Sequence, residues 1–115
     1  MKFSCEKALL QAAISTTSRA VSPKSSIPAL EGLLLQATPA GLTVSGYNMQ
    51  TGIRAKVSAE VTEPGEIVLN ARLFGDIVLR MPDDVIVFSA DPKLTVHLRC
   101  GDADFDILGL SAADY

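Results

Sequence analysis

MKFSCEKALLQAAISTTSRAV, residues 1–21, changes its hydrophobic period after residue 5. Residues 1–5 alternate between apolar and polar side chains, as in a short β-strand. From residue 6 onward the apolar side chains recur at steps of three and four, which is the period of an amphipathic helix. They are Leu9, Leu10, Ala13, Ile14, Thr17 and Val21. At 3.6 residues per turn this predicts a helix of about four turns. The helix ends soon after residue 21, because Pro23 disfavours helical geometry at Ser22.

A second strand and helix follow the same plan about 60 residues later. Residues 66–69 are predicted to form a short strand. Asn70 is a favourable N-cap, because its side-chain oxygen can accept a hydrogen bond from an otherwise unpaired helix N–H. Pro82 ends the predicted helix. Its apolar face consists of Leu73, Phe74, Ile77, Val78 and Met81. Its outward face carries Arg72, Asp76, Leu79 and Arg80.

Three predicted strands follow each helix. They are residues 29–37, 42–47 and 51–61 after the first, and 85–90, 94–100 and 103–110 after the second. In 51–61, apolar residues alternate with polar ones such as Arg54 and Lys56, which is typical of an antiparallel strand with one wet face. The sequence therefore predicts an α+β fold. A strand-helix-three-strand unit is duplicated, and two helices pack on one face of antiparallel sheet.

The length of 115 residues suits a single domain, residues 1–115. Its composition, 48% hydrophobic and 20% charged, is that of a globular domain. No apolar stretch approaches the roughly 20 residues that span a bilayer. The N-terminus lacks the apolar segment of a signal peptide, so we expect a cytoplasmic protein. Cys5 and Cys100 match no metal or redox motif, and we expect two reduced, structural thiols.

The net charge of −3 argues against a generally basic nucleic-acid binder. The charges are nevertheless unevenly distributed. Residues 1–56 carry six basic and two acidic side chains, whereas residues 57–115 carry four basic and eleven acidic ones. One face can therefore be basic while the whole chain is acidic, although composition alone also fits an asymmetry without function.

No combination of residues predicts catalysis. His97 is the only histidine, and its place in a predicted strand favours a structural or exposed side chain over a triad member or metal ligand. Asp83 and Asp84 are adjacent in a predicted turn, and nothing indicates that they share a pocket. No phosphate-binding glycine motif occurs. We therefore predict no catalytic residue, no metal and no cofactor.

Three aspartates, Asp102, Asp104 and Asp106, are predicted to share one face of the last strand, because strand side chains alternate with a period of two. Clustered carboxylates can bind Ca²⁺ or Mg²⁺, so a small hydrolase or metal site among the aspartates is the enzymatic alternative. The loop spacing and terminal glutamate of an EF-hand are absent. We favour a solvated or partner-facing edge strand, because charges on edge strands commonly oppose aggregation.

Five basic residues lie on or beside the polar faces of the two predicted helices. They are Lys7, Arg19, Lys24, Arg72 and Arg80. If the helices lie side by side, these side chains face the same direction and can contact phosphates, which supply affinity without sequence information. Each helix taken alone is also typical of an ordinary surface helix. No aromatic platform for stacked bases accompanies them, which argues against single-strand binding.

Five segments of the chain, taken in order and spacing, are typical of one family. They are MKF at 1–3, IPALEGLLL at 27–35, GLTVSGYNM at 41–49, LNARLFGDIV at 69–78, and the stretch from FDI at 105–107 to SAADY at 111–115. They resemble the N-terminal domain of the bacterial DNA sliding clamp, the beta subunit of DNA polymerase III. The resemblance covers essentially all 115 residues. It implies a non-catalytic processivity factor of DNA replication, with three such domains per subunit and two subunits closed into a ring.

The resemblance also implies how the ring holds DNA. The helices line the hole and present basic residues to duplex DNA without reading its sequence, while the sheets form the outside. Lys24 and Arg72 fall at positions where the family commonly has basic residues. Leu79 departs from the family, because that position is commonly basic, and Arg80 lies beside it.

The implied partners are duplex DNA, polymerase III, the clamp loader and a second clamp subunit. The last strand, around Phe105 and Ile107, corresponds to the edge that pairs with the third domain of the other subunit. The family's pocket for polymerase and loader peptides lies between its second and third domains, so we expect that pocket to lie outside this chain. The alternative is a stand-alone interaction domain that oligomerises through its last strand.

Overall fold

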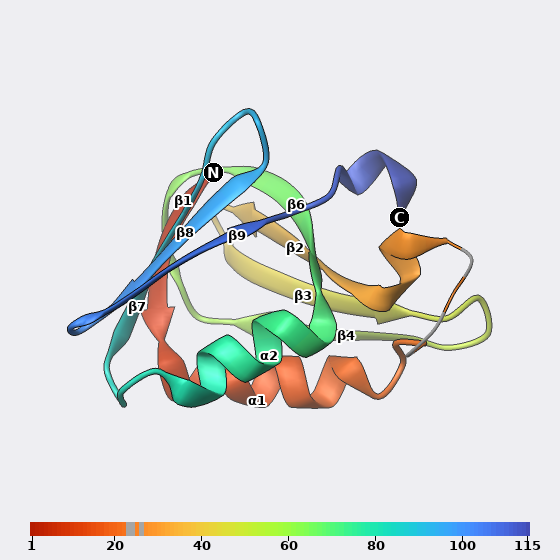
Figure 1. Cartoon of the computed structure of the whole chain (residues 1–115), viewed down its shortest axis with the longest axis horizontal. Helices are drawn as coiled ribbons and strands as arrows, with labels where there is room; N and C mark the ends of the chain where they lie inside the picture. The colour runs from red at the N-terminus through yellow and green to blue at the C-terminus, as the bar shows by residue number, and fades with distance from the viewer. Residues whose placement is uncertain (23–24, 26) are drawn as a thin grey trace.

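The computed structural model describes residues 1–22, 25 and 27–115 of the chain. These residues form two α-helices, α1 (Lys7–Ser18) and α2 (Ala71–Arg80), and nine β-strands. Two short 3-10 helices, η1 (Pro28–Glu31) and η2 (Ala112–Asp114), lie in connections. Figure 1 shows both α-helices on one side of the molecule, with the strands above them. Neither α-helix in this part of the chain has the length and apolar run that crossing a membrane would require.

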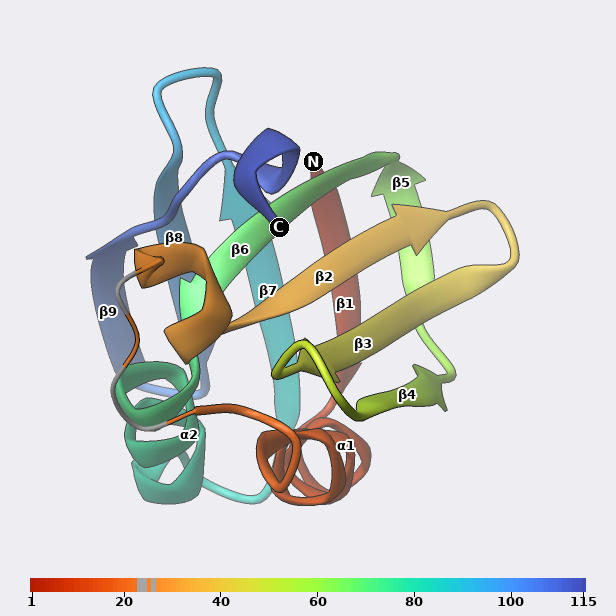
Figure 2. The ribbon, with the colours of Figure 1, turned by 90° about the vertical axis from the view of Figure 1, so that its right-hand side faces the viewer.

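The strands form two antiparallel sheets, and the predicted α+β class is confirmed. The five-stranded sheet has the order β5 (Glu60–Glu63), β1 (Lys2–Glu6), β7 (Val85–Ala90), β8 (Thr95–Cys100) and β9 (Ala103–Leu108). The four-stranded sheet has the order β4 (Gly52–Val57), β3 (Gly41–Tyr47), β2 (Gly32–Thr38) and β6 (Gly65–Asn70). Figure 2 shows the two sheets crossing above α1 and α2, so that one core lies between sheets and helices.

The duplicated strand-helix-three-strand unit is present, but its two copies exchange their first strands. β1 of the first copy pairs with β7 of the second, and β6 of the second pairs with β2 of the first. Each exchanged strand pairs on its other side with the end of its own copy. β1 pairs there with β5, and β6 forms a bridge from Val68 to Leu110. The exchange therefore joins the two copies into one hydrophobic core.

The predicted strand 51–61 is in fact two strands in two sheets. β4 ends at Val57 and pairs with β3, whereas β5 begins at Glu60 and pairs with β1. Ser58 and Ala59 carry the chain from one sheet to the other. The apolar alternation continues through the break, because Ala59 and Val61 also pack against the shared core. The periodicity of the sequence therefore contains no sign of the change of sheet.

The helices pack on the sheets through the residues that their hydrophobic period predicts. The buried residues are Leu10, Ala13, Ile14 and Thr17 of α1, and Ala71, Phe74, Ile77 and Val78 of α2. Gly46 of β3 lies against the last turn of α1, and a Cβ added there would lie 2.2 Å from the carbonyl oxygen of Thr17. The helix therefore approaches the strand more closely than any side chain at this position would allow.

Two details of the helices differ from the prediction. α1 ends at Ser18 rather than near Val21, because the N–H groups of Ala20 and Val21 donate to carbonyls three residues back and tighten the last turn. Leu9 and Leu73, predicted to face the core, are 44% and 47% exposed. Each lies beside the buried stripe of its helix, and that stripe is narrower than the sequence pattern indicates.

Three strand ends also differ from the prediction. Residues 28–31 form η1, because Pro28 at the first helical position favours a helical turn over a strand. β8 begins at Thr95, because Leu94 has a φ of 68° and its N–H closes a turn onto the carbonyl of Asp91. β9 ends at Leu108, after which Leu110 bridges to the other sheet.

Cys5 and Cys100 are free and buried, as the sequence predicts. Both pair with Ile86 of β7, one from each side. Two strand spacings of about 4.8 Å therefore separate their backbones, which exceeds the roughly 7 Å limit for a disulfide. Burial raises the pKa of the Cys5 thiol to about 12. The thiol is therefore protonated and unreactive at neutral pH.

Candidate nucleic-acid interface and sheet edge

The two helices lie side by side, as Figures 1 and 2 both show, and a lysine joins them. Lys7 Nζ, at the start of α1, donates hydrogen bonds to the carbonyl oxygens of Leu79 at 3.2 Å and Met81 at 2.6 Å. The end of a helix leaves carbonyls unpaired and favours a nearby cation. Lys7, predicted to face DNA, is therefore placed as a bridge that holds the C-terminus of α2 against α1.

Replacing Lys7 with methionine should lower the free energy of unfolding by about 1 kcal/mol, because two carbonyl oxygens lose a charged donor while most of the aliphatic stem remains. Urea denaturation of the two proteins measures the difference. Lys93→Met removes an exposed lysine from a loop and should change stability by less than about 0.5 kcal/mol. Equal stability of Lys7→Met and the unsubstituted chain would contradict the bridge.

The start of α2 follows the capping prediction. Asn70 Oδ1 accepts a hydrogen bond from the N–H of Leu73 at 3.0 Å, which confirms Asn70 as the N-cap. A hollow of about 430 Å³ separates this helix start from the end of α1. Its lining residues are Ser18, Val21, Ser22, Glu31, Asn70, Ala71 and Arg72. Arg72 is therefore held at the edge of a hollow that both helices line.

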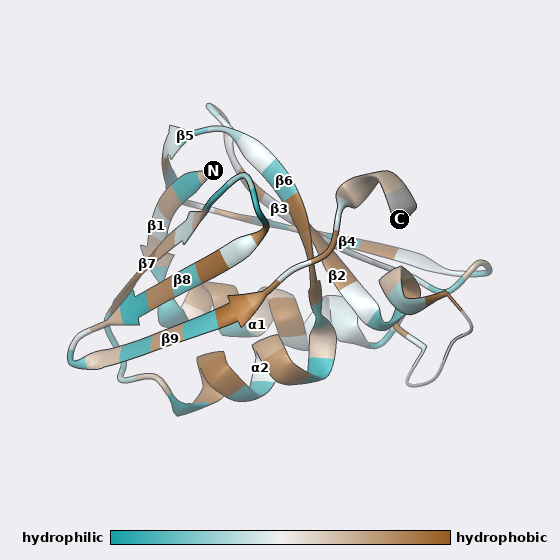
Figure 3. Cartoon of the chain, turned by 45° about the horizontal axis from the view of Figure 1, so that its top comes forward, coloured by the Kyte–Doolittle hydropathy of each residue, from teal (hydrophilic) through white to brown (hydrophobic). Residues whose placement is uncertain are grey.

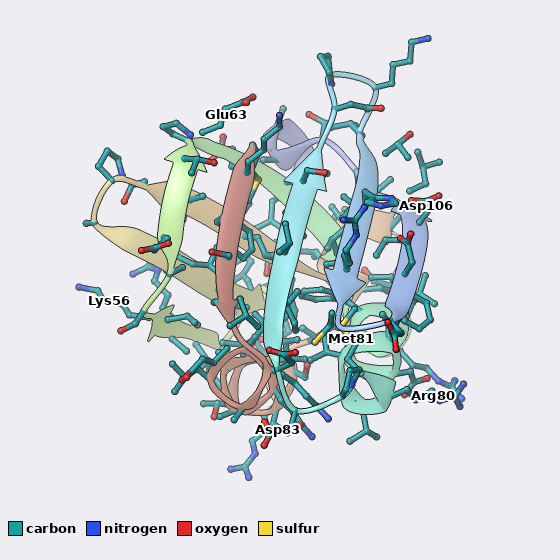
Figure 4. All side chains as sticks on the ribbon, turned by 90° about the vertical axis from the view of Figure 1, so that its left-hand side faces the viewer. Lys56, Glu63, Arg80, Met81, Asp83 and Asp106 are labelled. Atoms are coloured by element: carbon teal, nitrogen blue, oxygen red, sulfur yellow. The ribbon has the colours of Figure 1, made fainter. Side chains whose placement is uncertain are left out.

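The outward face of α2 carries two exposed arginines, Arg72 and Arg80, with Asp76 between them. Figure 4 shows Arg80 pointing away from the sheets. Within the described part of the chain, no hydrogen bond or ion pair joins either guanidinium to another side chain. Arg72 lies in the first turn of α2, where the helix dipole disfavours a cation. Neither arginine is used to stabilise the fold through an ion pair, so both are available to an anionic ligand.

Of the other two residues predicted to face DNA, the structure describes only Arg19. Arg19 is exposed directly after α1. Lys24 lies outside the described residues. Leu79 is 58% exposed beside Arg80, on the outward side of α2. The exposed basic residues of the described helical surface are therefore Arg19, Arg72 and Arg80, and Lys7 lies beside them with its Nζ bonded to the end of α2. Leu79 places an apolar side chain where the resemblance implies a basic one.

The last strand, β9, lies at the edge of the five-stranded sheet, where β8 is its one neighbour in the sheet order. Phe105 and Ile107 point inward and are half-buried against the core. The alternate residues Asp104, Asp106 and Leu108 are exposed, Leu108 at 73%. Figure 3 shows β8 and β9 on the open side of the molecule, with a hydrophobic end to β9. The strand predicted to meet another subunit is thus an edge strand, and the pairing itself remains a prediction.

His97 is held between two of the aspartates of β9. Its Nε2 lies 3.0 Å from Asp104 Oδ1, and its Nδ1 contacts Asp106 Oδ1. Figure 4 shows Asp106 on the outer face of this sheet edge. One ring nitrogen of His97 and one carboxylate oxygen from each aspartate lie within 4.8 Å of one another, close enough to hold a metal ion, and exposed acidic groups commonly lie this close without one. The structure therefore brings His97 together with Asp104 and Asp106 in one cluster, which was not among the predicted sites.

The two-residue turn between β8 and β9 is the sequence feature that could have predicted this cluster. Gly101 and Asp102 separate β8 from β9, and Gly101 has a φ of 56°. A two-residue hairpin turn fixes the register of the strands that it joins, and counting back from it places His97 opposite Asp106. Asp102 lies in the turn itself, so the prediction that it shares a strand face with Asp104 and Asp106 is wrong.

The other acidic pair is structural. Asp84 Oδ1 accepts a hydrogen bond from the N–H of Val85 at 2.7 Å, and the Asp84 carbonyl accepts one from the N–H of Lys7 at 3.0 Å. Asp83 and Asp84 are both exposed on the connection between α2 and β7. Asp84 thus ties that connection to the start of α1, and neither aspartate lines any of the described pockets, which acid–base chemistry would need.

The comparisons with solved structures agree with this architecture. The beta subunit from DNA polymerase of Streptococcus pyogenes aligns with a TM-score of 0.94 at 31% identity, covering 100% of this chain and 32% of that one. The DNA polymerase sliding clamp from Bacillus subtilis aligns with a TM-score of 0.94 at 29% identity, with the same coverage. The two-helix, two-sheet arrangement is therefore that of one part of these larger chains.

The sequence comparisons agree as well. The beta sliding clamps of Micrococcus luteus and Synechocystis sp. are 29% and 34% identical over the whole of this chain, which covers 37% and 32% of their lengths. The chain thus spans about a third of the length of the curated relatives that it matches. The family model described as DNA polymerase III beta subunit, N-terminal domain, matches residues 1–115. Because sequence and fold agree along its whole length, the chain belongs to the family of DNA polymerase III beta subunit N-terminal domains.

Proposed function

We propose that this chain is the first of three domains of a sliding-clamp subunit, and that the complete protein is a processivity factor of DNA replication. The observation that supports this most directly is the agreement with sliding clamps over 100% of the chain, in sequence and in fold. In this proposal the protein is a non-catalytic accessory subunit that needs no cofactor and works in the cytoplasm. Its processivity comes from enclosure of the duplex rather than from tight binding.

The helical surface is the proposed DNA-facing side. The exposed guanidinium groups of Arg72 and Arg80 and the exposed Arg19 support this, because they are free to meet phosphates. We include Lys7 and Lys24 in the same surface. Contacts to phosphates hold the duplex without reading bases, so the ring can slide along it. The exposed Leu79 beside Arg80 gives this domain a weaker hold than a basic residue would.

The β9 edge is the proposed contact with the third domain of a second subunit. Its position as an edge strand supports this, because an open strand edge can accept another strand by extending the sheet. Phe105 and Ile107 would supply the apolar part of the contact. Polymerase III and the clamp loader would bind the complete protein at a pocket outside this chain.

Topological enclosure can be tested with the full-length protein that contains this domain. The protein is loaded by its own clamp loader onto a singly nicked circular plasmid and separated from free protein by gel filtration. It should stay with the circle through the column. Cutting the plasmid once with a restriction enzyme should release it, because a ring slides off a free end. Equal retention on circular and linear DNA, or no retention on either, would contradict a sliding clamp. Association through β9 without retention on circular DNA would instead support the interaction-domain alternative.

The DNA-facing surface predicts the behaviour of the isolated chain. It should bind duplex DNA weakly and lose the binding by about 0.2 M salt, as expected for few phosphate contacts. Replacing Arg72 and Arg80 together with glutamine should weaken binding and lower the slope of log K against log salt by about 1 to 2. Fluorescence anisotropy with a labelled duplex at several salt concentrations measures both effects.

The matched control removes two positive charges from elsewhere. Arg54 is exposed on β4 and lines a hollow with Gln36 and Tyr115 that includes no residue of α1 or α2, and Lys93 is exposed in the β7–β8 loop. The double variant Arg54→Gln, Lys93→Gln has the same net charge as the Arg72, Arg80 variant. It should retain the salt slope of the unsubstituted chain. Equal losses in the two double variants would mean that net charge, and not the helical surface, determines binding.

A further inference from the structure

The open edge of β9 exposes backbone groups at three alternate residues. The N–H of Gly109 donates to the carbonyl of Leu94 at 2.8 Å, which fixes where the hydrogen-bonded pairs of β8 and β9 fall. Such pairs alternate along an antiparallel ladder. The N–H and C=O groups of Asp104, Asp106 and Leu108 therefore point away from β8, toward the open edge. Another strand can bind there without any change in the sheet.

The same three residues carry the exposed side chains of the strand. Two are carboxylates, Asp104 and Asp106, and the third is Leu108, which is 73% exposed. Asp102 adds a third exposed carboxylate in the adjacent turn. Opposite charges facing each other across a strand pair stabilise it, and like charges destabilise it. The strand that fits this edge therefore carries lysine or arginine opposite the aspartates and an apolar side chain opposite Leu108.

His97 determines how much negative charge the edge presents. A neutral imidazole has one N–H, so it can donate to Asp104 or to Asp106 but not to both. Both ring nitrogens contact a carboxylate, and donation to both at once is possible only for the protonated ring. The cluster of His97 and the two aspartates then has a net charge of −1. When the ring is neutral the same cluster has −2, and one carboxylate has lost its donor.

Two other charged groups are placed by the strand register near His97. Arg99 is two residues along β8 and directly opposite Asp104. On β7, the residue opposite His97 is the uncharged Ser89, and Lys2 of β1 lies beyond it. His97 is therefore the group that lies between the two carboxylates. As a class, imidazole side chains are the ones whose charge responds to pH in the physiological range.

We propose that the β9 edge is built to pair with a basic strand, and that protonated His97 weakens this pairing by occupying Asp104 and Asp106. This inference rests on the proposed function in one respect: the basic strand is taken to come from a second copy of the full-length protein, as the proposed ring requires. Ring closure is then favoured at neutral to slightly alkaline pH and loosened on acidification. The histidine acts as a counter-charge that competes with the partner's lysines or arginines.

The test measures the dimer dissociation constant of the full-length protein by analytical ultracentrifugation at about pH 6 and about pH 8, at constant ionic strength. The dissociation constant should be roughly fivefold larger at the lower pH. His97→Gln should make it equal at both pH values and close to the value of the unsubstituted protein at pH 8. The control Asp83→Asn removes an exposed carboxylate away from the edge and should behave like the unsubstituted protein.

Two variants of the aspartates test the charge of the partner. Asp104→Asn with Asp106→Asn should weaken the dimer at both pH values and remove its pH dependence. Asp104→Lys with Asp106→Lys should weaken it by more than about tenfold, because like charges then face each other. Circular dichroism of the isolated chain verifies that each exposed substitution leaves the fold intact.

The outcomes separate this inference from the ring itself. A dimer whose pH dependence is the same with and without His97 would overturn the role of the histidine. A dimer that is unchanged or tightened by the lysine substitutions would overturn the basic partner strand. In both cases the ring would stand. A protein that is monomeric at micromolar concentration at both pH values would instead contradict the proposed ring.

Discussion

Replacing Gly46 with alanine is expected to lower the free energy of unfolding by about 3 kcal/mol, at the upper end of the usual cost of overpacking. The added Cβ would lie 2.2 Å from the carbonyl oxygen of Thr17 and 3.3 Å from Val21 Cγ2. The obstruction at Thr17 is helix backbone, which cannot rotate away as a side-chain end could. α1 must therefore move off β3 or the strand must bend, and either movement opens the core beneath the helix.

The matched control is a glycine on the facing helix. A Cβ added at Gly75 of α2 would lie 3.5 Å from Ile14 Cγ2, which is ordinary van der Waals contact. Alanine is the better helix former, so Gly75→Ala should raise stability by up to about 1 kcal/mol. Urea denaturation of both variants gives the two values. Destabilisation by Gly75→Ala as large as that by Gly46→Ala would mean that the close contact at Thr17 does not set the helix position.

The two helices could be predicted from the sequence because their signals are local. The spacing of apolar residues identifies the buried face, and Asn70 and Pro82 mark the limits of α2 within a few residues. The prediction that Leu9 and Leu73 face the core is wrong. Their positions at the border of the stripe depend on how the helix is rotated against the sheet, which is a tertiary property.

The exchange of first strands could not be predicted. An alternating pattern shows that a strand has one buried face, but not which strand it pairs with or which sheet it joins. In residues 51–61 the two sheets share one interior, so alternation persists while the chain changes sheet at Ser58 and Ala59. The pairing depends on contacts between residues far apart in the chain, such as Phe3 with Phe88, whose rings stack at 4.5 Å.

Part of the candidate site could be predicted from residue type and helical spacing alone. The outward arginines of α2 follow from helical spacing, and the structure places Arg72 and Arg80 there, exposed. The use of Lys7 as a bridge was not predictable, because it depends on where α2 ends relative to α1. The relation of His97 to Asp106 depends on the register of one hairpin, which the Gly101 turn determines.

Replacing Phe74 with alanine is expected to have the largest effect of any single substitution considered, a loss of about 3 to 5 kcal/mol. Phe74 is fully buried in the core, where α2 contributes it to the space between helices and sheets. A loss of that size is a large fraction of the roughly 5–15 kcal/mol that stabilises a typical domain. The variant should unfold at a much lower urea concentration, and its helices should lose amide-exchange protection.

The neighbouring Leu73 provides the control, because it tests which face of α2 is buried. Leu73 was also assigned to the apolar face, yet it is 47% exposed while Phe74 is fully buried. Leu73→Ala should cost less than about 1 kcal/mol, because a side chain that is half in water loses little burial on truncation. If Leu73→Ala instead cost as much as Phe74→Ala, α2 would be rotated relative to the sheets. Arg72 and Arg80 would then turn with it, and the proposed DNA-facing surface would have to be reassigned. The difference in stability loss between Phe74→Ala and Leu73→Ala thus tests how α2 is oriented on the sheets, and the proposed DNA-facing surface depends on that orientation.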